Sequence, residues 1–204
     1  MTKALQRVVD HMLMPRCDIK LQFIQHGRSS CGDAWRDYSF ATVPSRILFV
    51  SRRSSLRSVL AEACLTHMGG HNLVAQYCGQ PGFVERSIHP AAMAALAGAR
   101  IPVPVMPPRP WTDLWRAGTP RLDLVVTLDE RVMASEPTWP GQPIATLWAF
   151  EDAALLADPD EAAPTAMRIL YSLQRRLELQ VNLPLGRADS SAIRSDLRDL
   201  GRMV

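Results

Sequence analysis

The segment from residue 46 to residue 63 constrains the fold of this chain more than any other. It reads as a short apolar strand at residues 47–50, a seven-residue loop of serines and arginines at residues 51–57, and a helix that follows directly. A loop between a strand end and a helix start presents backbone N–H groups that have no intrahelical partner, and the helix dipole adds partial positive charge there. We therefore predict that this loop binds phosphate or a similar tetrahedral oxyanion.

The side chains of the loop support the same prediction. Arginines supply fixed positive charge, and serines supply small hydroxyl donors that let a ligand approach closely. Arg52 and Arg53 have two interpretations: they select a strongly anionic ligand, or they form a solvated basic rim. The candidate phosphate-binding residues are Ser51, Arg52, Arg53, Ser54, Ser55, Leu56, Arg57 and Ser58.

The rest of the chain alternates strand and helix patterns. Near-continuous apolar runs predict further strands at residues 73–78, 122–128 and 143–148, and helical spacing predicts helices at 59–68, 90–98, 111–115 and 162–181. We expect Val59, Leu60, Ala63, Cys64 and His67 to form the apolar face of the first helix, with Cys64 buried and His67 at the surface or boundary near the helix end. In the long helix the expected buried positions are Met167, Leu170, Leu173, Leu177 and Leu179. This order predicts an α/β fold, a three-layer sandwich in which helices cover both faces of a four-stranded parallel sheet.

Length and pattern divide the chain into three parts. With 204 residues, of which 47% are hydrophobic, the chain is long enough for one sizeable core. We expect an N-terminal extension at residues 1–45, a single domain at 46–184 and a C-terminal tail at 185–204. A short helix that ends before Pro15 is expected in the extension, and Ile193, Leu197 and Leu200 suggest one in the tail. Exposed aromatics in the extension and the Leu197 helix leave a homodimer open.

Composition limits the partners. A net charge of +3 does not argue for nucleic acid, and no apolar run reaches membrane-spanning length, so we expect a cytoplasmic protein without nucleic-acid or membrane partners. Four irregularly spaced cysteines indicate reduced thiols. The spacings of Cys17 and Cys31, with His11 and His26 nearby, match no zinc pattern, and we expect neither a metal nor a cofactor.

Several motifs resemble, in order, those of the low-molecular-weight protein tyrosine phosphatases, including the thioredoxin-coupled arsenate reductases. The family's phosphate loop has Cys, five residues, Arg and Ser, and here Ser51, residues 52–56, Arg57 and Ser58 occupy that frame. The further matches are Ala61-Glu62-Ala63, Tyr77-Cys78-Gly79, His89-Pro90, Leu122-Asp123-Leu124-Val125-Val126-Thr127 and Trp148-Ala149-Phe150-Glu151-Asp152-Ala153. The resemblance spans residues 46 to about 184 and implies the family's fold.

The resemblance also implies roles for three residues, and one of them departs from the family. Ser51 stands at the position of the nucleophilic cysteine, Arg57 at that of the arginine that holds the oxyanion, and Asp152 at that of the general acid. A serine hydroxyl is far less acidic than a thiol, so it needs a general base that this loop does not offer. Ser54 and Ala153 also replace the family's Asn and Pro.

These departures favour one functional hypothesis and leave two others open. We expect a pseudophosphatase that binds phosphate or a phosphoprotein without turnover. One alternative is an active phosphatase whose nucleophilic cysteine was mutated to Ser51, in which case Asp152 keeps its role; otherwise Asp152 is only an exposed loop carboxylate. The other alternative is an interaction module with a vestigial site. An arsenate reductase mechanism is excluded by residue type, because the segment after Thr127 lacks the required cysteines.

Overall fold

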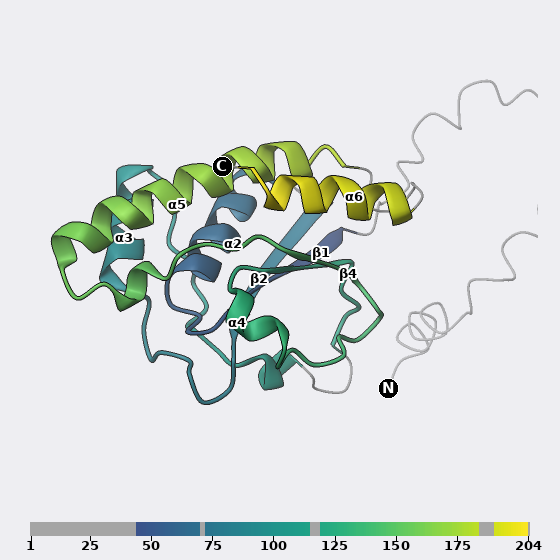
Figure 1. The fold of residues 1–204 in the computed structure, drawn as a ribbon, viewed down its shortest axis with the longest axis horizontal. Helices are drawn as coiled ribbons and strands as arrows, with labels where there is room; N and C mark the ends of the chain where they lie inside the picture. Colours follow the sequence, from purple (N-terminus) through teal and green to yellow (C-terminus); the bar gives the residue numbers. More distant parts are fainter. Residues whose placement is uncertain (1–43, 70–71, 115–118, 184–189, 204) are drawn as a thin grey trace, which may run out of the picture. The chain divides into compact units, whose positions relative to one another are not determined.

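A computed structural model describes residues 44–69, 72–114, 119–183 and 190–203, all of which belong to one compact unit. Its centre is a four-stranded parallel sheet with the strand order β2-β1-β3-β4 (Figure 1). The strands are β1 (Ser45–Ser51), β2 (Leu73–Gly79), β3 (Leu124–Thr127) and β4 (Ile144–Leu147). The predicted α/β fold is confirmed. The expected helix before Pro15 and the candidate metal ligands near residues 11–31 lie outside the described residues.

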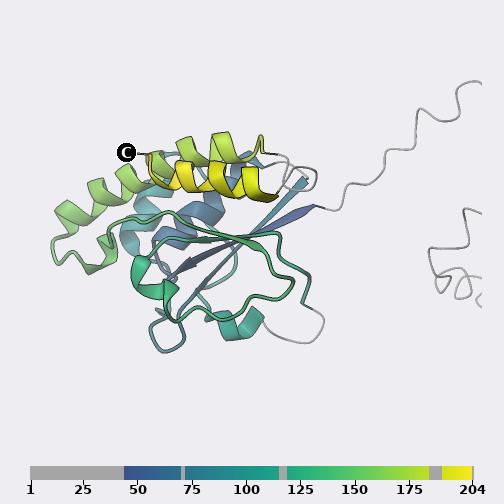
Figure 2. The same ribbon diagram turned by 45° about the vertical axis from the view of Figure 1, so that its right-hand side comes forward.

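Helices and short turns cover both faces of this sheet (Figures 1 and 2). The first face packs against α2 (Arg57–Met68), α3 (Pro90–Gly98), α5 (Pro159–Gln180) and α6 (Ser190–Gly201). The second face packs against η4 (Trp111–Leu114), α4 (Glu130–Met133) and Trp139. A further short turn, η5 (Ala153–Leu155), follows β4.

Strand β1 occupies the middle of the sheet because its side chains are apolar on both faces. Ile47 and Phe49 belong to the core on the α2 side, whereas Leu48 and Val50 belong to the core on the α4 side. Such a continuous apolar run is typical of a parallel strand that is buried on both faces. Its register pairs Ser51 with Gly79, which places the end of β1 beside the end of β2.

One expected buried position is wrong. Leu179 is 48% exposed, whereas Leu170, Leu173 and Leu177 are fully buried. The helical period explains this error, because it carries the buried face of α5 from Leu177 to Gln180 and leaves Leu179 on the opposite side. His67, expected at the surface or boundary, is exposed in the last turn of α2.

Helix α6 docks on the sheet, a point that the sequence pattern left undecided. Ile193, Leu197 and Leu200 are buried in the same core as α5, and the indole Nε1 of Trp148 donates to the carbonyl of Leu197 at 3.0 Å. A Cβ atom on Gly201 would lie 2.4 Å from the carbonyl oxygen of Leu147, so only glycine allows this close approach to β4. None of the helices in the described ranges is long and apolar enough to cross a membrane.

Candidate functional site

The loop between β1 and α2 is held in place from its outer side. Three of its carbonyl oxygens accept hydrogen bonds from backbone N–H groups of the 80–89 segment: Arg52 from Gln80 at 3.1 Å, Arg53 from Glu85 at 3.0 Å and Ser55 from His89 at 2.9 Å. In a trans peptide the N–H points opposite to the C=O of the same unit. The N–H groups of residues 53, 54 and 56 are therefore directed to the concave side of the loop, which we call the cradle.

Gly79 allows this loop to lie close to β2. A Cβ atom at position 79 would come within 2.8 Å of Ser54 Cβ and 3.0 Å of the Arg52 carbonyl oxygen. Ser54 has a positive φ of 58°, a conformation that few residues other than glycine and asparagine adopt. The Ser54 side chain thus faces β2, and the residue contributes its backbone N–H to the concave side.

We predict that Gly79→Ala weakens oxyanion binding and lowers the free energy of unfolding by about 1–3 kcal/mol, since the added methyl group forces backbone to move. The measurement is thermal unfolding with and without tungstate. Gly98→Ala is the matched control, because a Cβ there meets only the end of the flexible Met167 side chain, at 3.0 Å. Equal behaviour of the two variants would show that the loop does not depend on the close approach at Gly79.

Ser51 lies at the base of the cradle and is buried. Its Oγ accepts a hydrogen bond from the N–H of Ser54 at 3.3 Å and donates one to the Oγ of Ser58 at 2.9 Å. In the described part of the chain no histidine, carboxylate or lysine bonds this hydroxyl. Among the described residues, the hydroxyl of Ser51 therefore has no hydrogen-bond acceptor stronger than another hydroxyl.

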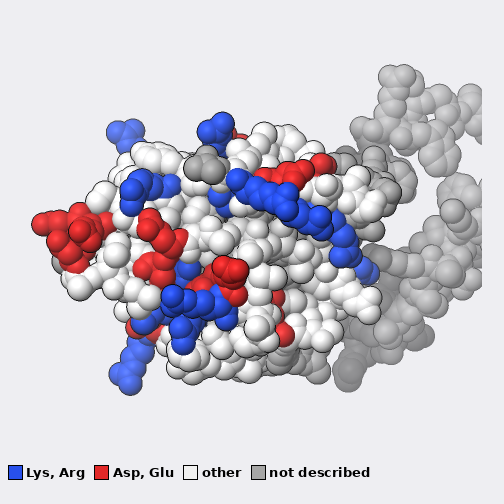
Figure 3. All heavy atoms as spheres, viewed as in Figure 1, with Lys and Arg blue, Asp and Glu red and all other residues white. Residues whose placement is uncertain are grey.

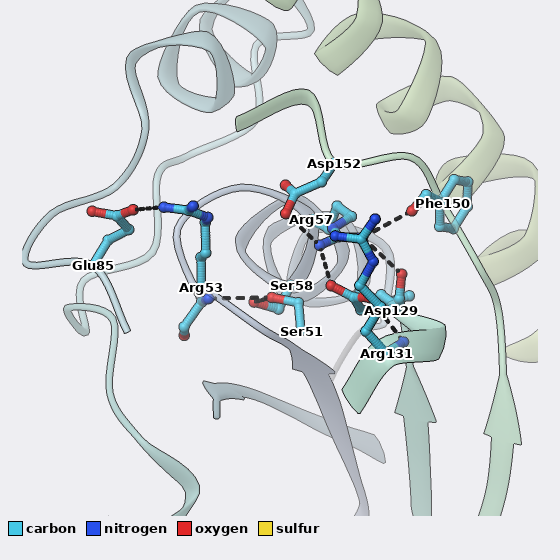
Figure 4. A network of polar contacts seen from close by, with 11 residues as sticks. Ser51, Arg53, Arg57, Ser58, Glu85, Asp129, Arg131, Phe150 and Asp152 are labelled. Atoms are coloured by element: carbon cyan, nitrogen blue, oxygen red, sulfur yellow. Dashed lines mark hydrogen bonds and ion pairs between the residues drawn. The ribbon is translucent and has the colours of Figure 1, made fainter. Parts of the chain in front are cut away.

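Arg57 is the most constrained residue of the site, with 3% of its side chain exposed. Its Nη1 donates to the carbonyl of Phe150 at 2.8 Å and to that of Leu128 at 3.3 Å, while its Nη2 pairs with Asp129 at 2.6 Å and Asp152 at 2.9 Å (Figure 4). All four Nη hydrogens are therefore committed to protein acceptors. An oxyanion can bind both Nη atoms only by displacing one of these acceptors. The side chain of Asp152 is 14% exposed and that of Asp129 is 8% exposed, so Asp152 is the carboxylate placed to move.

Sequence reasoning did not single out Asp129. It follows β3 directly and caps α4, where its Oδ1 accepts from the N–H of Arg131 at 3.1 Å, while its Oδ2 holds Arg57. The available signal was its place at the carboxyl end of a buried parallel strand, the edge where such sheets bind ligands. Asp152, which the sequence did single out, meets it at Arg57 from the loop after β4.

The other two arginines of the loop contact the 80–89 segment. Arg52 stacks on Phe83, with its guanidinium carbon 3.9 Å from the ring centroid, and Arg53 pairs with Glu85 at 2.5 Å. Figure 4 shows the Arg53 side chain pointing to Glu85 and away from Arg57. In this conformation their side chains lie on the rim, and their backbone forms the cradle.

Phe150 connects the site to the C-terminal helices. Its carbonyl holds Arg57, and its ring lies 4.5 Å from the guanidinium carbon of Arg176 on α5. Arg176 also donates to the carbonyl of Met203, beyond the end of α6, and burial lowers its pKa. A groove of about 410 Å³ opens beside Arg57 and is lined by Asp129, Asp152 and Leu155 among others.

The two described cysteines are buried and are not activated as nucleophiles. Cys64 is buried in α2, as the sequence predicted, and Cys78 is buried in β2 beside Val50. Burial raises the pKa of the Cys64 thiol to about 12 and raises that of Cys78 further. Neutral thiols are poor nucleophiles, so neither is suited to attack a bound oxyanion.

Comparisons with known proteins concern the family and the fold of this chain. The family model of the low molecular weight phosphotyrosine protein phosphatases matches residues 46–159. An arsenate reductase in its phosphate binding state is 24% identical over 67% of this chain and 96% of its own, with a TM-score of 0.53. The arsenate reductase from Archaeoglobus fulgidus is 23% identical over 67% and 99%, with a TM-score of 0.53. YfkJ from Bacillus subtilis is 16% identical over 76% and 99%, with a TM-score of 0.50.

No curated protein matches the chain significantly. At these identities the solved structures establish the fold alone, and they share the parallel sheet described above. The family model covers more than half of the chain, from the start of β1 through the loop that carries Asp152. The chain belongs to the low molecular weight phosphotyrosine protein phosphatase family.

Proposed function

We propose that this protein binds phosphate or a phosphorylated ligand in the loop at residues 51–58 and does not hydrolyse it, so that it acts as a regulatory pseudophosphatase. The observation that carries the proposal is Ser51. It stands at the end of β1, where the family places its nucleophilic cysteine, while Arg57 keeps the position of the oxyanion-holding arginine.

The contacts of Ser51 argue against nucleophilic attack. A hydroxyl becomes a competent nucleophile when an adjacent base takes its proton or its pKa falls strongly. The Oγ of Ser51 contacts only the Ser54 N–H and the Ser58 hydroxyl within the described residues, and neither is a base. The electrostatics that would ionise a thiol at this point leave a serine protonated near neutral pH.

The backbone of the loop and Arg57 support the binding of an oxyanion. The cradle is preorganised, because hydrogen bonds to the 80–89 segment fix three loop carbonyls on the outside. A ligand that binds such a site loses little free energy in ordering the protein. The start of α2 adds positive charge beside the loop, and the guanidinium of Arg57 adds more when the ligand displaces Asp152.

A ligand titration coupled to a turnover assay tests this proposal. We expect phosphate, vanadate and tungstate to raise the melting temperature, since a ligand that binds only the folded state stabilises it by about 2.7 kcal/mol at 100 times its Kd. We expect no hydrolysis of p-nitrophenyl phosphate. Turnover that disappears in Ser51→Ala would contradict the proposal, and no thermal shift at millimolar ligand would favour an interaction module with a vestigial site.

The position of Asp152 favours a second candidate, an active phosphatase in which Ser51 replaces an original cysteine. Asp152 lies 2.9 Å from Arg57, as a general acid beside the bound phosphoryl group would. The encoding gene separates the candidates directly: a cysteine codon at position 51 supports the active enzyme, and a serine codon supports the pseudophosphatase.

We predict that Asp152→Asn increases the affinity for tungstate by about tenfold. The substitution removes a carboxylate that competes for Arg57 and repels an incoming anion, and about 1.4 kcal/mol corresponds to that change. Isothermal titration calorimetry measures it. The matched control is Glu151→Gln, because Glu151 is 61% exposed and pairs with Arg168 instead. An unchanged or weaker affinity of Asp152→Asn would show that Asp152 does not compete with the ligand.

A further inference from the structure

Helix α6 separates its side chains into three faces. At 100° per residue, Ile193, Leu197 and Leu200 fall together on the buried face. Arg194 and Arg198 fall together on one flank, and Asp196 and Asp199 fall on the opposite flank, while Arg202 lies in the turn that follows the helix. Docking on the sheet requires only the apolar face, so the sorting of positive and negative charge to separate sides calls for another explanation.

The basic flank lines a groove of about 440 Å³ between α6, the edge strand β4 and the segment that follows β3. Figure 3 shows a stripe of arginine side chains in the region where Figure 1 draws α6. The residues that line the groove include Arg194, Arg198, Arg202, Thr146, Glu136 and Ala149.

The charges in this groove are predominantly positive, and the positive groups are exposed to solvent. All three arginines are exposed, and in the described part of the chain only Arg202 has a carboxylate partner, Asp199, at 4.0 Å in a well-solvated position. The opposing carboxylate in the groove is that of Glu136. Its two oxygens already accept hydrogen bonds from Thr127 and Trp139. Three arginines thus line the groove with one carboxylate, whose two oxygens are already hydrogen-bonded.

The basic groove adjoins the groove beside Arg57. Ala149 lines both this groove and the groove of about 410 Å³ beside Arg57. Helix α6 lies beyond residues 46–159, the part of the chain that matches the family, so the family match gives this flank no role. We propose that the α6 groove binds an acidic segment of a protein partner whose phosphoryl group occupies the loop at residues 51–58. This inference rests on the proposed function.

The spacing of the arginines fits an extended polypeptide. Positions i and i+4 on a helix are about 6 Å apart along the axis. Alternate side chains of an extended chain are about 6.7 Å apart. Acidic residues at alternate positions can therefore reach Arg194 and Arg198. The mild net charge of +3 and Glu136 in the groove wall disfavour nucleic acid.

Fluorescence anisotropy with three peptides tests this inference. One peptide carries phosphotyrosine and alternating glutamates on both sides, the second has the same sequence with tyrosine, and the third has phosphotyrosine with neutral flanks. We expect the first to bind most tightly. In the variant with Arg194→Gln, Arg198→Gln and Arg202→Gln its affinity should fall about tenfold at 0.15 M salt and less at 0.5 M. The third peptide should be unaffected.

A charge-matched variant, Arg100→Gln with Arg121→Gln and Arg175→Gln, removes three exposed arginines that do not line the groove. Equal loss in both variants, or no loss in either, would overturn the inference. The inference would also be overturned if a 20-base-pair DNA duplex bound through these arginines and the acidic peptides did not bind. If the neutral phosphopeptide fails to bind but the acidic unphosphorylated one binds through α6, the loop proposal fails and the α6 groove stands.

Discussion

Ser51→Cys is expected to give the chain measurable phosphatase activity. The cradle N–H groups, the start of α2 and Arg57 all stabilise negative charge at this position, and a thiol gains far more ionised form from them than a hydroxyl does. The thiolate would attack phosphorus, and the leaving oxygen would take a proton from Asp152. Water would then hydrolyse the thiophosphate intermediate. We expect hydrolysis of p-nitrophenyl phosphate to rise by at least about 10³-fold over the natural chain.

Two controls make this result specific. Ser51→Ala should remain inactive. Ser58→Cys adds a thiol at the residue that is hydrogen-bonded to Ser51, and it should not gain activity, because Ser58 lies in the first turn of α2. If Ser51→Cys binds tungstate but does not turn over, the missing cysteine is not the only defect. The commitment of Arg57 to Asp129 and Asp152, or the Ala153 substitution, would then limit the chemistry.

The sequence predicted the fold well because its signals are local. The apolar run at residues 47–50 identifies a doubly buried strand, and Pro90 at the start and Gly98 at the end mark α3. Each strand and each of the longer helices in the described ranges lies close to its predicted bounds. The short elements α4 and η5 were missed, since three or four residues are too few to show a helical period.

The contacts of the site could not be predicted in the same way. Arg57 meets Asp129 and Asp152 across 72 and 95 positions of sequence, and no local pattern encodes such a pairing. The same holds for Arg53, whose pairing with Glu85 depends on how the 80–89 segment folds over the loop. Residue types gave the chemistry of the loop, whereas the partners of its arginines emerge only from the tertiary structure.

Replacing Arg57 is expected to destabilise the protein severely as well as abolish oxyanion binding. Arg57→Met removes the cation between two carboxylates that are 8% and 14% exposed, and it leaves the carbonyl of Phe150 without its donor. Breaking a buried ion pair in this way costs about 3–5 kcal/mol. In a chain of this size that lowers the melting temperature by about 6–20 °C, measured by differential scanning calorimetry.

A variant that also carries Asp129→Asn and Asp152→Asn separates the two effects of Arg57. Neutral amides no longer require a cation, so most of the lost stability should return, while tungstate binding should stay absent because the guanidinium is gone. The comparison substitution is Arg53→Met, whose ion pair with Glu85 is 36% and 44% exposed and should contribute less than about 1 kcal/mol. If the triple variant is as unstable as Arg57→Met alone, the destabilisation comes from lost packing, and the two carboxylates are not what makes Arg57 necessary to the fold.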